Sequence, residues 1–352
     1  MHRTWRHAFA QLEVLLSINY FMIGKYTREQ LEHGGDTQVE HDRLRAIFDD
    51  LVDRGRKGIV LSMIEKDFVY HGITFFNENP NNFPFVDDAR FKHLYLTYGY
   101  DITGGSIYLK VRRTERIQVP LLEKENDLNY LTDEADKWEK LVALNNHKDQ
   151  LLQLISAEFR NERKELDISL NISGQPQLAG SNYYQYKVWG TYLRARIVYI
   201  YTKQIFEETS PADCIYSLCG ETIEFTQYSM AHIINRHFAE VTKQFNSGKD
   251  YHLEDIIPWI MPSQLKSIIS EIDKSGLLKR QVQTELNFRY KGQIYQVWAT
   301  LQYKQVKGQK GNIQYKRIDS FYPVSDPTIL AKLTATYKET VLNDDISLFV
   351  PI

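Results

Sequence analysis

Two alternating strand patterns joined by a tight turn near the C-terminus restrict the fold of this chain more than any other feature. Apolar and polar residues alternate from Thr284 to Tyr290 and again from Gln293 to Lys304, as they do in half-buried strands. Lys291-Gly292 between them is a tight-turn signal, and a third strand is expected from Ile313 to Tyr322. Three consecutive strands joined in this way predict an antiparallel meander.

Helices are expected ahead of the meander. A short strand pair is predicted at 215–225, after which Thr226 or Ser229 can cap a helix that runs to about residue 245. A further helix is predicted at 262–275, with a proline near its first turn. Helices first and an antiparallel sheet last is the order of an α+β fold.

A chain of 352 residues is longer than one average domain, so two domains are expected. We predict a mixed helix/strand region at 1–213, with room for two subdomains, that senses, targets or restrains, and a small α+β domain at 214–352. Helical patterns in the first region fall at 5–32, 38–54 and 128–164. Strand-like segments are expected there at 58–63, 67–76, 91–100, 106–119, 165–170 and 183–201.

Charge and cysteine content exclude several classes of protein. The formal net charge is −2, so a nucleic-acid site must be a local patch and not the whole surface. Cys214 and Cys219 are too few for a disulfide framework, which fits a reduced cytoplasmic setting. Leu12 to Ile23 is interrupted by Glu13 and is interpreted as an amphipathic buried helix. No stretch approaches the roughly 20 apolar residues of a membrane span, so no membrane partner is expected.

The densest group of reactive side chains is His232, Arg236 and His237, within six residues of one predicted helix. Residues four apart lie on nearly the same helical face, so His232 and Arg236 would point together, whereas His237 is rotated from His232 by roughly 140°. Histidine can transfer protons near neutral pH, and arginine can hold a phosphate. The alternative is a packed core histidine with a surface arginine beside it.

The meander is rich in positive charge. The window from Lys274 to Arg317 contains ten lysines and arginines, and its only acid is Glu285. A sheet with this imbalance predicts a surface for a polyanion such as RNA. A solvated, lysine-rich hairpin is the alternative.

The helix with His-Ile-x-x-Arg-His, the short helices after it and the final strand Arg317-Ile-Asp-Ser-Phe-Tyr-Pro323 resemble the barnase, EndoU, colicin and RelE-like superfamily of ribonucleases, above all its phage and polymorphic-toxin branches. The resemblance covers about residues 220–325. It implies a metal-independent endoribonuclease without a cofactor. In such enzymes the 2′-hydroxyl attacks the adjacent phosphate and leaves a 2′,3′-cyclic phosphate or its hydrolysed 3′-phosphate.

The resemblance also implies roles for particular residues. His232 would transfer the proton, Arg236 would bind or polarise the phosphate, and His237 would be a second acid/base or would brace the helix. Ser320 would contact the phosphate. Further implied ligands of RNA and phosphate are Arg289, Thr300, Lys304, Arg317 and Tyr322. Asp319 departs from this pattern, and it is tolerable only if strand alternation turns it away from Ser320.

The layout implied by the resemblance is that of a toxin or phage-defence effector that acts on RNA, with tRNA among its possible substrates and an inhibitor or antitoxin protein as a possible partner. Two other interpretations stay open. One is a non-catalytic nucleic-acid-binding module that uses the same basic sheet. The other is a metal-dependent nuclease that uses His232 and His237, although their spacing is poor for joint ligation and no carboxylate cluster accompanies them.

Overall fold

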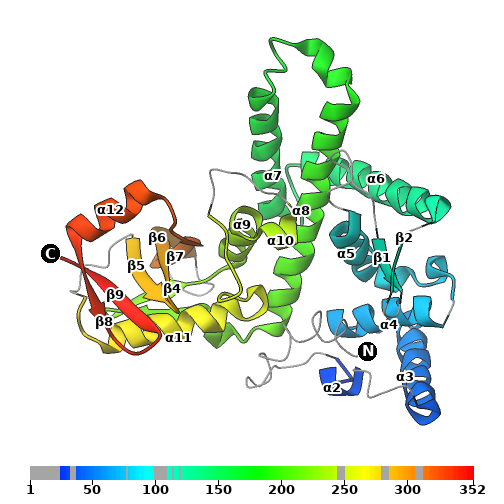
Figure 1. Ribbon diagram of the computed structural model, residues 1–352, viewed down its shortest axis with the longest axis horizontal. Coiled ribbons are helices and arrows are strands. Elements are labelled where there is room, and N and C mark those ends of the chain that lie inside the picture. Colours follow the sequence, from blue (N-terminus) through cyan, green and yellow to red (C-terminus); the bar gives the residue numbers. More distant parts are fainter. Residues whose placement is uncertain are drawn as a thin grey trace. The chain divides into compact units, whose positions relative to one another are not determined.

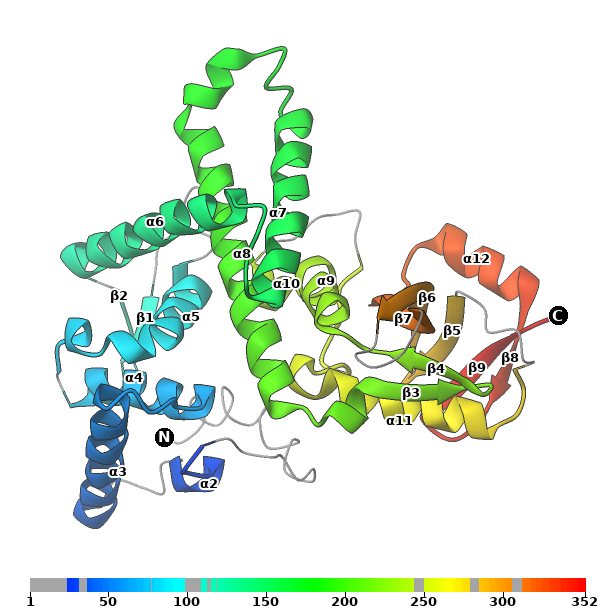
Figure 2. The same ribbon diagram turned by 180° about the vertical axis from the view of Figure 1, so that it is seen from behind.

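The structure, a computed structural model, describes residues 24–31, 37–76, 78–98, 109–112, 115–118, 120–243, 250–278, 285–305 and 312–352 (Figures 1 and 2). The chain divides into two compact units. Unit 1 comprises residues 1–144 and 158–200, and unit 2 comprises 145–157 and 201–352. The predicted boundary after residue 213 lies slightly further along the chain. Among the described helices, none combines the length and the apolar character needed to cross a membrane.

Unit 1 consists mainly of helices. Its described elements are α2 (Arg28–Leu31), α3 (Gln38–Arg56), α4 (Met63–Phe75), the 3-10 turns η1 (Pro80–Asn82) and η2 (Pro84–Val86), α5 (Asp87–Tyr98), the strands β1 (Leu109–Arg112) and β2 (Glu115–Gln118), α6 (Leu121–Ala143), most of α7 (Gln150–Ser169), η3 (Pro176–Gly180) and most of α8 (Asn182–Glu208). The strands β1 and β2 form an antiparallel hairpin. The helices predicted at 38–54 and 128–164 are present, and most of the one predicted at 5–32 lies outside the described residues.

Most strands predicted in the first region are wrong. The segments 67–76, 91–100 and 165–170 lie largely in helices α4, α5 and α7, and 183–201 lies in α8. Residues 191–198 of α8 are all buried, so this helix lacks the polar face that would give a helical period in the sequence. Its many tyrosine, valine and isoleucine residues favour strands, but packing overrides such preferences.

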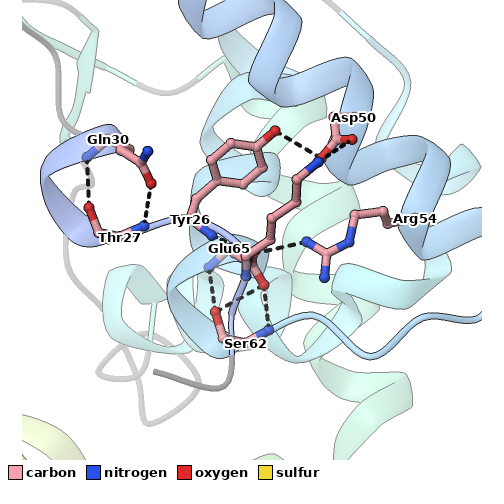
Figure 3. A network of polar contacts seen from close by, with 8 residues as sticks. Tyr26, Thr27, Gln30, Asp50, Arg54, Ser62 and Glu65 are labelled. Carbon is pink, nitrogen blue, oxygen red and sulfur yellow. Dashed lines mark hydrogen bonds and ion pairs between the residues drawn. The ribbon is translucent and has the colours of Figure 1, made fainter. Parts of the chain in front are cut away.

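A saturated polar network joins the start of the described chain to α3 and α4 (Figure 3). The Glu65 side chain is fully buried and accepts hydrogen bonds from the backbone N–H groups of Lys25 (2.7 Å), Tyr26 (3.2 Å) and Ser62 (2.9 Å). The Arg54 guanidinium lies 3.1 Å from the same carboxylate. Ser62 and Glu65 also form the reciprocal pair that caps the start of α4. One buried charge therefore organises three segments.

Unit 2 contains helices and one large sheet. After residues 145–157 and the end of α8 come η4 (Pro211–Cys214), β3 (Ile215–Leu218), β4 (Glu221–Glu224), α9 (Gln227–His237), α10 (Ala239–Thr242), η5 (Pro258–Ile260), α11 (Met261–Lys274), β5 (Glu285–Tyr290), β6 (Gln293–Gln305), β7 (Asn312–Pro323), α12 (Pro327–Thr336), β8 (Tyr337–Val341) and β9 (Ile346–Pro351). The predicted meander is present as β5, β6 and β7. The α+β class is confirmed.

The sheet has the strand order β3-β4-β7-β6-β5-β9-β8. Only the short β4–β7 pair is parallel among the described ladders. Lys291 and Gly292 both have positive φ angles, as the tight turn between β5 and β6 requires. Three elements after residue 322 were not predicted from the sequence: the strands β8 and β9 extend the sheet, and α12 packs against it.

The two faces of the sheet differ. One face carries buried apolar residues of β5–β7, among them Phe288, Val297, Ile318 and Phe321. Buried apolar side chains of α9 and α11 supply more of the core of unit 2, with α9 against β7 and α11 against β3. On the other face, Leu333 of α12 packs in a small cluster with three residues of the sheet and its flanks, Ile294, Val324 and Phe349.

Candidate nuclease site on the polar face of the sheet

Cross-strand pairs show which side chains share the second face of β5, β6 and β7. Trp298 is opposite Ser320, Thr300 is opposite Arg317, and Gln296 is opposite Tyr322, so these six lie on one side. Asn287 and Glu285 of β5 pair with Gln296 and Trp298 and join them. We call this surface the polar face; its members are Glu285, Asn287, Gln296, Trp298, Thr300, Arg317, Ser320 and Tyr322.

Helix α9 carries the histidine motif alongside β7. Thr226 caps it, and Thr226 and Ser229 form a reciprocal capping box, as the sequence predicts for this start. His232, Arg236 and His237 are all half-buried, so none of the three is sealed in the interior. The helix ends at His237, so the motif occupies its last two turns.

His237 is the residue of this motif that meets the polar face. Its Nδ1 lies 2.9 Å from the carbonyl oxygen of Asp250, which can only accept, so Nδ1 carries the proton. Nε2 then has a lone pair in the neutral ring, and it lies 3.3 Å from the hydroxyl of Ser320. The ring stacks on Tyr322 with centroids 4.9 Å apart and an interplanar angle of 15°. These contacts fix the tautomer, direction and tilt of the imidazole.

His252 ties the two sides of this arrangement together. Its backbone N–H donates to the carbonyl of His237 at 2.8 Å, and its Nε2 lies 2.8 Å from the carbonyl oxygen of Phe321. The ring is buried among Phe238, Tyr295 and Phe321. Burial lowers the pKa of His252 to about 3, so the ring is neutral at physiological pH. His252 therefore holds the end of α9 next to the strand that carries Ser320.

A β-bulge changes the expected direction of Asp319. The pairing of β6 with β7 shifts between Trp298 and Ala299, so one extra residue is inserted in β7 between Ile318 and Ser320. Asp319 accepts hydrogen bonds from the Thr300 hydroxyl and from Arg317 Nε at 2.8 Å, on the same face as Ser320. Strand alternation would have allowed Asp319 to face away from Ser320, but alternation does not hold across a bulge. The carboxylate instead shares this face and is compensated by Arg317.

Tyr322 connects the His237 contact to a row of amides. Its hydroxyl donates to Gln296 Oε1 and accepts from Trp298 Nε1 at 3.0 Å. Gln296 Nε2 in turn donates to Glu285 at 2.7 Å and to Asn287 at 3.0 Å. Burial raises the pKa of Tyr322, so its phenol stays protonated. These contacts hold in place the Tyr322 ring, on which the His237 imidazole stacks.

His232 takes part in a second cluster further back along α9. Its ring stacks on Tyr228, with centroids 5.8 Å apart and an interplanar angle of 12°. The Arg317 guanidinium lies 3.9 Å from the centre of the Tyr228 ring and is also paired with Asp319. Arg317 therefore contacts Tyr228, the ring on which His232 stacks, and Thr300 shares the Asp319 carboxylate with Arg317. Ser320 and Tyr322 instead contact His237.

Half of the cations predicted to line the sheet can be examined, because the side chains of Lys279, Arg280, Lys304, Lys307 and Lys310 lie outside the described residues. Four of the five described ones are paired with acids that lie outside the window from Lys274 to Arg317. Arg289 forms a two-pronged pair with Glu339 at 2.7 and 3.1 Å, so this carboxylate already engages its guanidinium. The other ion pairs are Lys274–Glu271, Lys316–Glu221 and Arg317–Asp319.

The side chains around the histidine motif are not arranged as metal ligands in the described part of the chain. Within the described ranges, no group of three or more His, Cys, Asp or Glu side chains is arranged to hold a metal ion. His237 Nδ1 is engaged by the Asp250 carbonyl, and Nε2 faces Ser320. The site positions an imidazole nitrogen next to a hydroxyl, an arrangement that can transfer a proton.

Sequence reasoning missed Asp250 and His252, which orient His237. Asp250 acts through a backbone carbonyl, which any residue could supply, so no residue type marks it. His252 is a single histidine outside the motif, and only its packing against Phe321 shows its role.

Comparisons with protein-family models, curated proteins and solved structures found no match to this chain. The resemblance to ribonucleases therefore rests on the residues of unit 2 alone.

Proposed function

We propose that unit 2 is a metal-independent endoribonuclease that cleaves RNA by attack of the 2′-hydroxyl on the adjacent phosphate. The observation that carries the proposal is the fixed geometry of His237. The Asp250 carbonyl holds Nδ1–H, and Nε2 faces the Ser320 hydroxyl on a half-exposed polar face. A neutral imidazole held in one tautomer is a suitable general base near neutral pH.

The proposal assigns the proton-transfer role to His237 instead of His232. Nε2 of His237 would take the proton of the 2′-hydroxyl as the 2′-oxygen bonds to phosphorus. The P–O5′ bond would then break, the 5′-oxygen would leave as a hydroxyl with a proton taken from water, and the imidazolium would return its proton to that water. Ser320 would contact the phosphate. Arg236 keeps the role that the resemblance implies, balancing charge that develops on the phosphate, and it lies in the same last turn of α9 at about 100° around the helix from His237. His232 and Tyr228, which stack on each other, would contact a neighbouring nucleotide.

We also propose a compartment and a biological role for the protein. The protein would act in the cytoplasm as a toxin or phage-defence effector, with unit 1 in a regulatory role and an inhibitor protein as a possible partner. Every RNA carries the 2′-hydroxyl and the phosphodiester on which this reaction acts, so tRNA and other transcripts are candidate substrates.

The test is incubation of the purified full-length protein with total RNA in the presence of EDTA, followed by mapping of the cut ends. We expect cleavage that persists in chelator and leaves 2′,3′-cyclic phosphate or 3′-phosphate ends. RNA that is shifted in a gel but intact would instead indicate a binding module. Activity that disappears with EDTA would indicate a metal-dependent nuclease and would overturn the proposal.

A pair of variants tests which histidine transfers the proton. His237→Gln is expected to abolish cleavage, because glutamine cannot accept and return a proton near neutral pH. His232→Gln is expected to retain cleavage and to change mainly KM. The opposite result would return the catalytic role to His232 and Arg236.

A further inference from the structure

We propose that unit 1 binds a small organic anion, a flat ring that carries a phosphate or carboxylate group, in a cavity beside α4, α5 and α6. The cavity has a volume of about 320 Å³. Sites for small molecules range from about 300 to 1,000 Å³, so it suits a compact ligand. All of its lining residues belong to unit 1, so the inference is independent of the ribonuclease proposal.

Part of the cavity lining is apolar and aromatic. Phe83 and Val86 are buried, and Pro84 lies between them in the chain. Tyr70 of α4 supplies a second aromatic ring. Burial raises the pKa of Tyr70 to about 12, so the phenol remains a neutral donor and acceptor at physiological pH. Such a wall can hold an aromatic ring by stacking or edge contacts.

Another part of the lining presents a positioned guanidinium. Arg90 of α5 donates from Nη1 to the Asn81 side-chain oxygen at 3.2 Å, and its guanidinium lies 4.1 Å from the centre of the Tyr130 ring. These two contacts hold the planar group in place. A guanidinium has five N–H donors, so the Asn81 contact leaves others for a phosphate or carboxylate.

The charge balance of the lining favours an anion. Lys137 of α6 adds a second cation, paired with Glu134 through its ammonium group. Asp87 is the one carboxylate in the lining, and both of its oxygens are engaged: Oδ1 by the Tyr130 hydroxyl at 2.7 Å and Oδ2 by Arg196 at 2.7 Å. Among the lining residues, Lys137 and Asp87 each have an oppositely charged partner, so the Arg90 guanidinium supplies the positive charge that favours an anion.

The aromatic and the cationic side chains that line the cavity together indicate the class of ligand. An inorganic anion would leave the side chains of Tyr70 and Phe83 without an apolar ligand group, and a neutral ring would leave the Arg90 guanidinium without an anionic partner. A nucleoside monophosphate has both parts, and it serves as the probe. The shared chemistry, a ring with one anionic group, is what the cavity would recognise.

The experiment is calorimetric titration of the full-length protein with 5′-AMP, adenosine and inorganic phosphate. We expect saturable binding of 5′-AMP and binding that is at least about tenfold weaker for adenosine and for phosphate. Failure of 5′-AMP to bind at millimolar concentration, or equal binding of 5′-AMP and adenosine, would overturn the proposal.

Matched variants locate the site. Arg90→Gln and Lys137→Gln are each expected to weaken 5′-AMP binding about tenfold. Lys137 is 65% exposed, so its replacement leaves the fold intact even if Arg90→Gln does not. Lys140→Gln, an exposed lysine on the same helix that does not line the cavity, is the control and should bind as the wild type does. Equal weakening by Lys140→Gln would show that the effect is only surface charge and would overturn the assignment. His237→Gln in unit 2 should leave binding unchanged.

Discussion

The Glu65 network of unit 1 and the His237 network of unit 2 are both built from polar side chains and backbone groups. They differ in burial and in how completely the central side chain is hydrogen-bonded. Glu65 is fully buried and its two carboxylate oxygens accept five hydrogen bonds from four residues (Figure 3). His237 is half-buried, and its Nε2 meets Ser320 across a longer distance of 3.3 Å. A saturated buried charge serves stability, whereas an oriented group with a loose, accessible partner is suited to chemistry.

The largest difference is expected in activity. His237→Gln should reduce RNA cleavage by about 100- to 10,000-fold, the usual contribution of a general acid or base. The melting temperature should change little, because the half-buried ring makes few contacts that support the core. Initial rates with labelled RNA and thermal melts of the same samples measure both. Equal loss of activity and of thermal stability would make His237 a structural residue and would remove the contrast with Glu65.

Glu65→Gln should have the reverse effect. The amide cannot satisfy all of the donors that the carboxylate accepts, and it leaves the Arg54 charge poorly compensated. We expect unit 1 to lose about 3 kcal/mol of stability. Hydrogen exchange of the α3 and α4 amides is the measurement, and cleavage per folded molecule should be unchanged. Asp50→Asn is the control within the same network: its partner Lys25 is 51% exposed, so a much smaller change is expected.

His252 should make the stability of unit 2 depend on pH. Its folded-state pKa of about 3 lies below the value of about 6.5 expected in the unfolded chain, so the unfolded state binds the extra proton between these values. Stability is therefore complete above the unfolded pKa and falls as the pH decreases. We expect a loss of about 2 kcal/mol between pH 7.5 and pH 5.

Urea unfolding at the two pH values, followed by hydrogen exchange in β6 and β7, measures this loss. His252→Gln should remove most of it, because glutamine does not titrate. The exposed His71 of unit 1 provides the control, and His71→Gln should keep the full dependence in unit 2. A wild-type protein whose β6 and β7 amides are equally protected at both pH values would show that His252 is not kept neutral by the fold.

Local signals predicted the parts of unit 2 that are set by neighbouring residues. Alternation and the Lys291-Gly292 turn gave β5, β6 and β7, and Thr226 gave the start of α9. Ser62 and Glu65 carry the same kind of capping signal, and it would have identified the start of α4 had it been weighed against the strand-like residues that follow. Short-range patterns succeed because a cap or a turn is completed within a few residues.

Long-range features could not be predicted from these patterns. The β-bulge at Asp319 depends on how β7 pairs with β6, and it reverses the expected direction of one carboxylate. The choice between His232 and His237 depends on Asp250 and His252, which lie beyond the helix that carries both histidines. Ion pairs with Glu221 and Glu339 likewise join segments far apart in sequence, and they compensate two of the cations that a count along the chain leaves unpaired.

The smallest effect is expected at Ser320. It tests how much the contact between the Ser320 hydroxyl and His237 Nε2 contributes to the rate of the proposed cleavage. Ser320→Ala removes a single hydroxyl at 3.3 Å from His237 Nε2, so the rate of cleavage should fall only about three- to tenfold if Ser320 contacts the phosphate. Ser275→Ala, at the end of α11, removes a hydroxyl bound to a helix carbonyl and is the control. A loss as large as that of His237→Gln would instead make the Ser320 oxygen a nucleophile activated by the imidazole. Such a result would assign the His237 network to covalent catalysis, and the two networks would then differ in reactive chemistry as well as in exposure.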